Sequence, residues 1–161
     1  MVDVAEHTVS SPDITGGVLE TRLFWPRALD TPRGSPLSAV AAAAGGRCVL
    51  VVHQYSIMGG SQELMRGIAR SFALHHGVTA CTLNLRGVGG SSGMPSLTGS
   101  SEVADVVAVG AWLQKAGFTH ILLVCSSAGG PIGGSALDSV PAFTGCAARA
   151  PPGRPASASP P

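Results

Sequence analysis

The stretch that decides the fold is His120-Ile-Leu-Leu-Val-Cys-Ser-Ser-Ala-Gly-Gly130. Its first part, residues 120–125, is an apolar run of strand length, and such runs are typical of strands covered on both faces. Small residues follow, and the segment from Ala128 to Asp138 indicates a helix. The sequence therefore predicts a buried strand, a tight turn around Ser127 and a helix.

The segments before this stretch alternate in the same way. Strands are predicted at residues 18–25, 47–53 and 78–85, the first as part of a strand pair within residues 1–30. Residues 31–46 have no periodic pattern and are predicted as a loop. Helices are predicted from Ser61 and from Ser100 or Ser101 to about Ala116. In the first, the apolar stripe consists of Leu64, Ile68 and Phe72 and is widened by Met65 and Ala69. This alternation favours an α/β fold with a mostly parallel sheet of about five strands and flanking helices.

Composition excludes several classes of protein. The 161 residues carry a net charge of +1, which argues against a nucleic-acid-binding surface. Charged residues make up 12% of the chain and the mean hydropathy is +0.33, so the body is not a highly charged disordered chain. Apolar runs are far shorter than the roughly 20 residues of a membrane span. The start of the chain has no apolar signal region, so we expect a cytoplasmic protein.

Nothing in the sequence indicates a metal or a cofactor. The four cysteines, Cys48, Cys81, Cys125 and Cys146, form no C-x-x-C pair and are expected to be buried thiols rather than zinc ligands. The run Gly87-x-Gly89-x-x-Ser92 departs from the dinucleotide-binding fingerprint at its last position. No Gly-Lys-Ser/Thr sequence of a phosphate-binding loop is present.

The turn around Ser127 matches the setting of a nucleophile elbow, G-x-S-x-G, between a strand and a helix. When the sequence is aligned with this pattern, Cys125 occupies the position of the first Gly, Ser127 that of the nucleophilic Ser and Gly129 that of the last Gly. The backbone N–H of Ala128 would lie at the helix N-terminus, where it can stabilise an oxyanion. Taken alone, Ser-Ser-Ala-Gly-Gly is equally a low-complexity turn.

Two further motifs precede this turn in a characteristic order. His53-Gln-Tyr-Ser-Ile-Met-Gly-Gly-Ser61 follows one predicted strand, and Arg86-Gly-Val-Gly-Gly-Ser91 follows the next. Together with the elbow, the segment from about residue 49 to 138 resembles the α/β-hydrolase superfamily, particularly its serine-aminopeptidase-like and esterase-like members. Their loop often has the sequence H-P-Y-S-x-x-G-G, so Gln54 departs from the usual Gly or Pro.

The resemblance implies a serine hydrolase that acts on small-molecule esters or amides, without a cofactor or metal. It implies that Ser127 is the nucleophile and that the backbone N–H groups of Tyr55 and Ala128 form the oxyanion hole. It assigns Arg86 to a structural turn and Asp105 to a structural helix acid.

Two parts of the expected machinery are missing from this chain. In the resembled fold the acid and the histidine follow the serine, whereas all five histidines here precede Ser127 and Asp138 is the only later acid. His53 is a possible substitute base, or it orders its own loop. The chain therefore resembles the N-terminal half of a hydrolase that lacks the C-terminal strands. An inactive or truncated relative, or a non-catalytic binding module, is the alternative to an active enzyme.

The last segment differs in composition from the rest. Residues 141–161 hold six of the twelve prolines and no acidic residue. We therefore predict a truncated hydrolase domain at residues 1–140 and a disordered tail at 141–161. Strand 120–125 would then be an unprotected sheet edge, through which the chain is expected to self-associate.

Overall fold

The computed structural model describes residues 1–32, 34–55, 57 and 59–149. Six strands form one sheet: β1 (Val2–Ser10), β2 (Val18–Pro26), β3 (Arg47–Val52), β4 (Thr79–Leu83), β5 (His120–Ser126) and β6 (Phe143–Arg149). The helices are η1 (Arg27–Leu29), α1 (Leu37–Ala43), α2 (Gln62–His75), α3 (Ser100–Lys115), α4 (Gly129–Ala136) and η3 (Leu137–Ser139).

The strands are ordered β1-β2-β4-β3-β5-β6. β4, β3, β5 and β6 are parallel, while β1 and β2 form an antiparallel hairpin whose second strand pairs with β4. Because the four parallel strands run the same way, their carboxyl ends and the loops that follow β3, β4 and β5 share one edge of the sheet. The predicted α/β fold with a mostly parallel sheet is confirmed.

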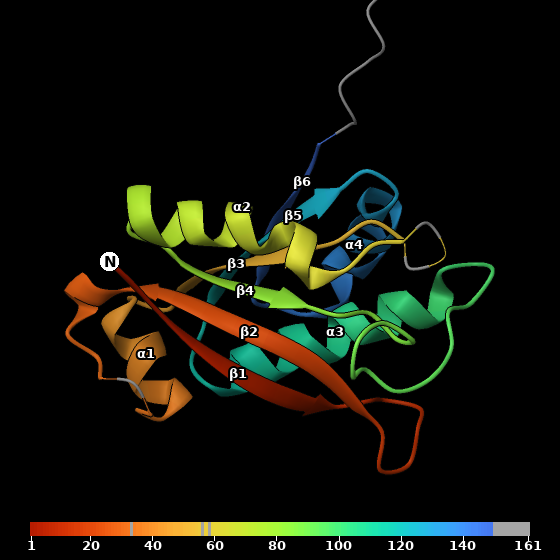
Figure 1. Cartoon of the computed structure of the whole chain (residues 1–161), viewed down its shortest axis with the longest axis horizontal. Helices are drawn as coiled ribbons and strands as arrows, with labels where there is room; N and C mark the ends of the chain where they lie inside the picture. Colours follow the sequence, from red (N-terminus) through yellow and green to blue (C-terminus); the bar gives the residue numbers. More distant parts are fainter. Residues whose placement is uncertain (33, 56, 58, 150–161) are drawn as a thin grey trace, which may run out of the picture.

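Helices cover both faces of this sheet (Figure 1). α2 packs on one face through Met65, Ala69 and Ala73. α1, α3 and α4 pack on the other, against a cluster that includes Trp25 and Leu50. Both faces of β3 and β4 are therefore buried, which explains their continuous apolar sequences. β5 is fully buried on one face only, because Leu122 on its other face is 38% exposed, so the prediction that residues 120–125 are covered on both faces is wrong. None of the described helices is both long and apolar enough to cross a membrane.

The predicted apolar stripe of α2 is buried along one side only. Leu64 is 56% exposed, and Ile68 and Phe72 are only partly buried, whereas Met65 and Ala69 are buried. Two alanines on the inner face let the helix lie close to the sheet, so small residues rather than the largest apolar ones make the contact.

The predicted loop at residues 31–46 contains a helix, so that prediction is wrong for this part. Pro36 is the N-cap residue of α1, and four of the seven helical residues are alanine. Alanine has the highest helix propensity, and proline is well tolerated at a helix start. Val40 and Ala41 are buried against the core, so packing stabilises this short helix.

The tail predicted at residues 141–161 is wrong for residues 143–149, which form β6 beside β5. The described residues therefore form a sheet of six strands, close to the about five predicted, and β5 is not an edge. The argument for self-association through residues 120–125 no longer applies, because β6 pairs with this strand. Residues 150–161 lie outside the described part of the chain.

One side chain of β6 reaches across the core. Phe143 is 8% exposed, and its ring lies where a Cβ atom of Gly110 in α3 would be. A glycine in the middle of a helix costs about 1 kcal/mol relative to alanine. Gly110 leaves room for the Phe143 ring, so α3 and β6 pack closely at this point.

The Arg86 guanidinium connects three segments of the chain. It forms a buried two-pronged ion pair with Asp105 of α3, at 2.7 Å from Nη2 to Oδ1 and 3.1 Å from Nε to Oδ2. It also bonds to Asp13 in the β1–β2 connection, at 2.8 Å from Nη1 to Oδ2. The Arg86 backbone N–H donates to Asp105 as well. These contacts support the structural roles predicted for both residues.

We expect Phe143→Ala to lower the free energy of unfolding by about 3–5 kcal/mol, because it leaves a cavity against α3. Thr144→Ser, a change at an exposed position of the same strand that keeps the hydroxyl which donates to the Ile121 carbonyl, should shift it by less than about 0.5 kcal/mol. Urea denaturation of both variants measures this difference. Equal stabilities of the two variants would show that β6 does not contribute to the core.

Candidate active site

β5 leads into α4 through a turn of two residues. Ser127 has φ +48°, in the left-handed region that non-glycine residues rarely adopt. Ala128 follows as the N-cap residue of α4, and the Gly130 N–H donates to the Ser127 carbonyl at 2.9 Å. The predicted strand, tight turn and helix are thus present, with the backbone strain centred on Ser127.

Glycines on α4 make this turn sterically possible. A Cβ atom at Gly129 would overlap the carbonyl oxygen of His53 at the end of β3. A Cβ atom at Gly133 would overlap the sulfur of Cys125. Cys125 stands where the elbow pattern has a glycine, and its side chain is accommodated because the helix residue that faces it, Gly133, is itself a glycine.

The loop after β3 lies beside the start of α4, because the His53 carbonyl touches Gly129. Tyr55 follows two residues later and packs, half-buried, against the core. The backbone of Tyr55 and that of Ala128 therefore belong to two neighbouring loops on the same sheet edge. Ser56 and Met58 lie outside the described residues.

Both ring nitrogens of His53 are occupied by local hydrogen bonds. Nε2 accepts from the Leu85 N–H at 3.0 Å, which places the proton on Nδ1, and Nδ1 donates to the Gln54 carbonyl at 2.5 Å. The side chain is fully buried, and burial lowers its pKa. His53 therefore orders the β3 and β4 loops and is not positioned as a base for Ser127.

The other four histidines lie away from this turn. His120 begins β5, roughly 20 Å of strand from Ser127. His75 and His76 end α2, which leads to the amino end of β4. His7 on β1 lies against Trp112 of α3, with the rings tilted and their centroids 5.4 Å apart.

Asp138, the only acid after Ser127, is also remote from it. It is exposed in η3, beyond the far end of α4. Ser127 itself is half-buried, and no described side chain hydrogen-bonds to its Oγ. The described residues therefore supply a strained serine without a base or an orienting acid.

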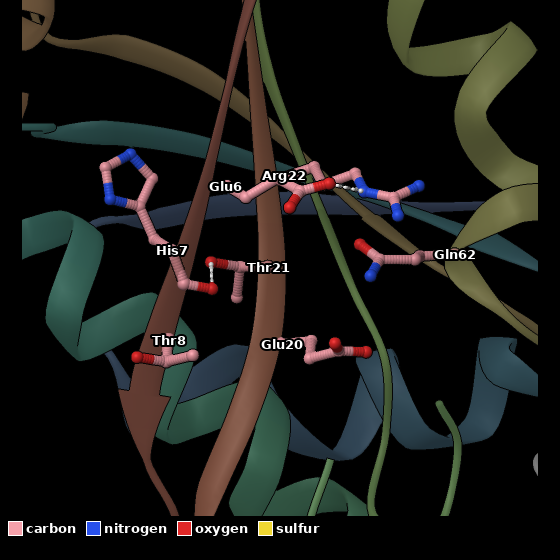
Figure 2. A pocket seen from close by; sticks show the side chains of 7 residues that line it. All are labelled: Glu6, His7, Thr8, Glu20, Thr21, Arg22 and Gln62. Carbon is pink, nitrogen blue, oxygen red and sulfur yellow. Dashed lines mark hydrogen bonds and ion pairs between the residues drawn. The ribbon is translucent and has the colours of Figure 1, made fainter. Parts of the chain in front are cut away.

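A groove of about 430 Å³ lies elsewhere, between the β1–β2 hairpin and α2 (Figure 2). In it Arg22 pairs with Glu6 at 3.0 Å and with Glu63 of α2. Glu20 accepts from the Asn84 side chain and from the Gly90 N–H. Arg22 is thus paired with two carboxylates, and Glu20 is hydrogen-bonded to neutral donors. β5 lies three positions from β2 in the strand order of the sheet. The groove therefore does not belong to the site at Ser127.

The described residues contain no group of three or more His, Cys, Asp or Glu side chains that could hold a metal ion. Cys48 and Cys81 are buried in β3 and β4, where each thiol donates to the carbonyl of the next residue at 3.6 Å. Cys125 is buried as well, whereas Cys146 on β6 is partly exposed.

No protein-family model matches this sequence, and no curated protein matches it. Solved structures do resemble its fold. A serine hydrolase without a lid from Xanthomonas campestris is 23% identical, with a TM-score of 0.64 over 86% of this chain and 57% of its own. An α/β serine hydrolase homologue from Coxiella burnetii is 24% identical, with a TM-score of 0.62 over 83% and 57%.

An esterase from Pyrococcus furiosus is also similar, at 18% identity and a TM-score of 0.61, over 88% of this chain and 49% of its own. This chain has the α/β-hydrolase fold, and it spans roughly half to three-fifths of the length of these three proteins. The resemblance inferred from the three sequence motifs is thereby confirmed at the level of the fold.

We expect Ser127→Gly to raise the free energy of unfolding by roughly 1 kcal/mol, because glycine adopts a positive φ without strain. Asp30→Gly is the matched control, since Asp30 has φ +49° and aspartate tolerates this region better. It should stabilise the chain less. Thermal and urea unfolding compare the two. Loss of stability in Ser127→Gly would show that the turn is not strained.

We also expect the free energy of unfolding to fall as the pH drops below about 6.5, the ordinary pKa of histidine. Burial lowers the folded-state pKa of His53 and of His7, so the unfolded chain binds protons first and acid favours unfolding. The slope should reach at most about 1.4 kcal/mol per pH unit for each group. Urea titrations at several pH values measure it, and His53→Gln should flatten the curve. A flat wild-type curve would contradict this.

Proposed function

We propose that Ser127 is the nucleophile of a serine hydrolase site for small-molecule esters or amides. The observation that supports this most strongly is the positive φ of Ser127 at the junction of β5 and α4. Strain of this kind persists only where the surrounding structure imposes it, and it is concentrated at functional sites. A strained serine on a strand-to-helix turn is the geometry of a nucleophile elbow.

In this proposal the substrate carbonyl lies between two loops. Ser127 Oγ attacks the carbonyl carbon, and the negative charge that develops on the oxygen is stabilised by the N–H groups of Ala128 and Tyr55. Ala128 is the N-cap residue of α4, so the partial positive charge of the helix start favours the oxyanion. The similarity of the fold to esterase and serine hydrolase structures supports this substrate class.

We further propose that the 161-residue chain does not complete the reaction on its own. The Ser127 proton must pass to a base when the tetrahedral intermediate forms. His53 is engaged through both nitrogens, and the remaining histidines lie elsewhere in the fold. A cytoplasmic binding role without turnover is the second proposal, and the same absence of a base among the described side chains favours it.

The test of these proposals is turnover of p-nitrophenyl acetate by the purified chain. We expect it to be no faster than that of Ser127→Ala, because removal of the base from a catalytic triad costs roughly 10⁴–10⁶ in kcat. Ser126→Ala, a change of the neighbouring serine, is the control. A burst that depends on Ser127, or labelling of Ser127 by a fluorophosphonate in wild type and Ser126→Ala, would show that the chain carries a working base.

A further inference from the structure

Two cysteines lie against each other directly below the turn of Ser127. The sulfurs of Cys125 on β5 and Cys146 on β6 are 3.7 Å apart, and both are free thiols. Cys125 is 1% exposed, whereas Cys146 is partly exposed. Cys146 is thus accessible to small reagents, and the buried Cys125 lies next to it.

The packing of α4 brings this pair together. Gly133 lies over both sulfurs, because a Cβ atom there would overlap Cys125 Sγ and would lie 3.5 Å from Cys146 Sγ. In the parallel register Cys146 stands opposite Leu123, and Cys125 opposite Ala148. The two cysteines are therefore diagonal neighbours whose side chains lean toward each other.

We propose that Cys125 and Cys146 are a redox modification site, at which a peroxide converts the two thiols into a reversible disulfide that alters the backbone at Ser127. First, the Cys146 sulfur attacks hydrogen peroxide, so that the O–O bond breaks and a sulfenic acid and water form. The Cys125 sulfur then attacks the sulfenic sulfur. Its proton leaves with the hydroxide as a second water, and the peroxide has taken up two electrons.

The different environments of the two thiols explain why Cys146, and not Cys125, reacts first with peroxide. Burial, and then the neighbouring Cys146 thiol, raise the pKa of Cys125 to about 12, so Cys125 remains protonated and does not react first with peroxide. Cys146 has the exposure that an attacking thiol needs. The proximity of Cys125 then favours disulfide formation over further oxidation of the Cys146 sulfenic acid.

The bond requires movement at the end of β5. A disulfide has an S–S length of about 2.05 Å, so the sulfurs must approach from 3.7 Å, and diagonal strand neighbours need a backbone shift to do so. Cys125 is two residues before Ser127. Oxidation is therefore expected to change the geometry of the turn, whether or not the chain is a hydrolase.

The chain contains its own control for this reaction. Cys48 and Cys81 are also diagonal neighbours on parallel strands, because Cys48 pairs with Thr79 and Cys81 with Leu50. Both are at most 2% exposed, and each thiol donates to its own strand. Cys48 and Cys81 have the same relative register as Cys125 and Cys146 but are not exposed, so we expect peroxide to leave them unreacted.

The experiment treats the folded chain with hydrogen peroxide, unfolds it in an alkylating agent and digests it with trypsin. Cleavage after Lys115 and Arg149 gives one peptide, 116–149, that contains both Cys125 and Cys146. We expect it to be unalkylated and lighter by two hydrogen atoms, and to become doubly alkylated after treatment with a thiol reductant. Peptides 48–66 and 71–86, which carry the control thiols, should be alkylated throughout.

Cys146→Ser and Cys125→Ser separate the steps. Neither variant should form the disulfide, and only Cys125→Ser should accumulate sulfinic acid, at Cys146. Hydrogen exchange at residues 126–130 should change on oxidation of the wild type and not of Cys146→Ser. A doubly alkylated wild-type peptide, a covalent dimer through Cys146 or unchanged exchange at the turn would each overturn the proposal.

Discussion

The close contact between the first turn of α4 and the carboxyl end of β3 is the constraint on which the site depends. Gly129 lies against the His53 carbonyl with no room for a side chain, so the helix begins almost on top of the neighbouring strand. The chain leaving β5 must then reverse within two residues, and Ser127 takes the left-handed conformation as a result. The same contact sets the Tyr55 loop beside the helix start. The strained conformation of Ser127 and the position of the Tyr55 loop therefore both depend on the absence of a side chain at Gly129.

Titratable side chains near this edge stabilise the scaffold. His53 satisfies a backbone N–H after β4 and a carbonyl after β3, and Asp105 neutralises Arg86 inside the protein. Buried polar groups cost free energy unless they are paired. An arrangement of the loops that breaks one of these contacts would therefore be less stable than the observed one. A histidine close in sequence to an active-site motif is thus not by that fact a catalytic base. The hydrogen-bond partners of both ring nitrogens decide its role.

The sequence predicts the parts of the fold that carry a strong local pattern. The apolar runs of β3, β4 and β5 and the small residues around Ser127 have such patterns, and the motif order predicts the hydrolase fold. β6 has no such pattern, because Phe143–Arg149 contains glycine and alanines with low strand propensity and is ordered by pairing with β5. α1 is too short for periodicity to emerge. The surroundings of His53 could not be predicted, since its partner Leu85 is distant in sequence and the tautomer depends on three-dimensional contacts.

The position of Arg86 also bears on the order in which the protein folds. Its two carboxylate partners are separated from it by 73 and 19 residues along the chain, and one of them lies in the hairpin at the amino terminus. The complete set of contacts can form only when this hairpin, the loop after β4 and α3 have all assembled. A contact that forms only after the folding transition state slows unfolding more than it accelerates folding. The lifetime of the native state, rather than the speed of its formation, should depend on this guanidinium.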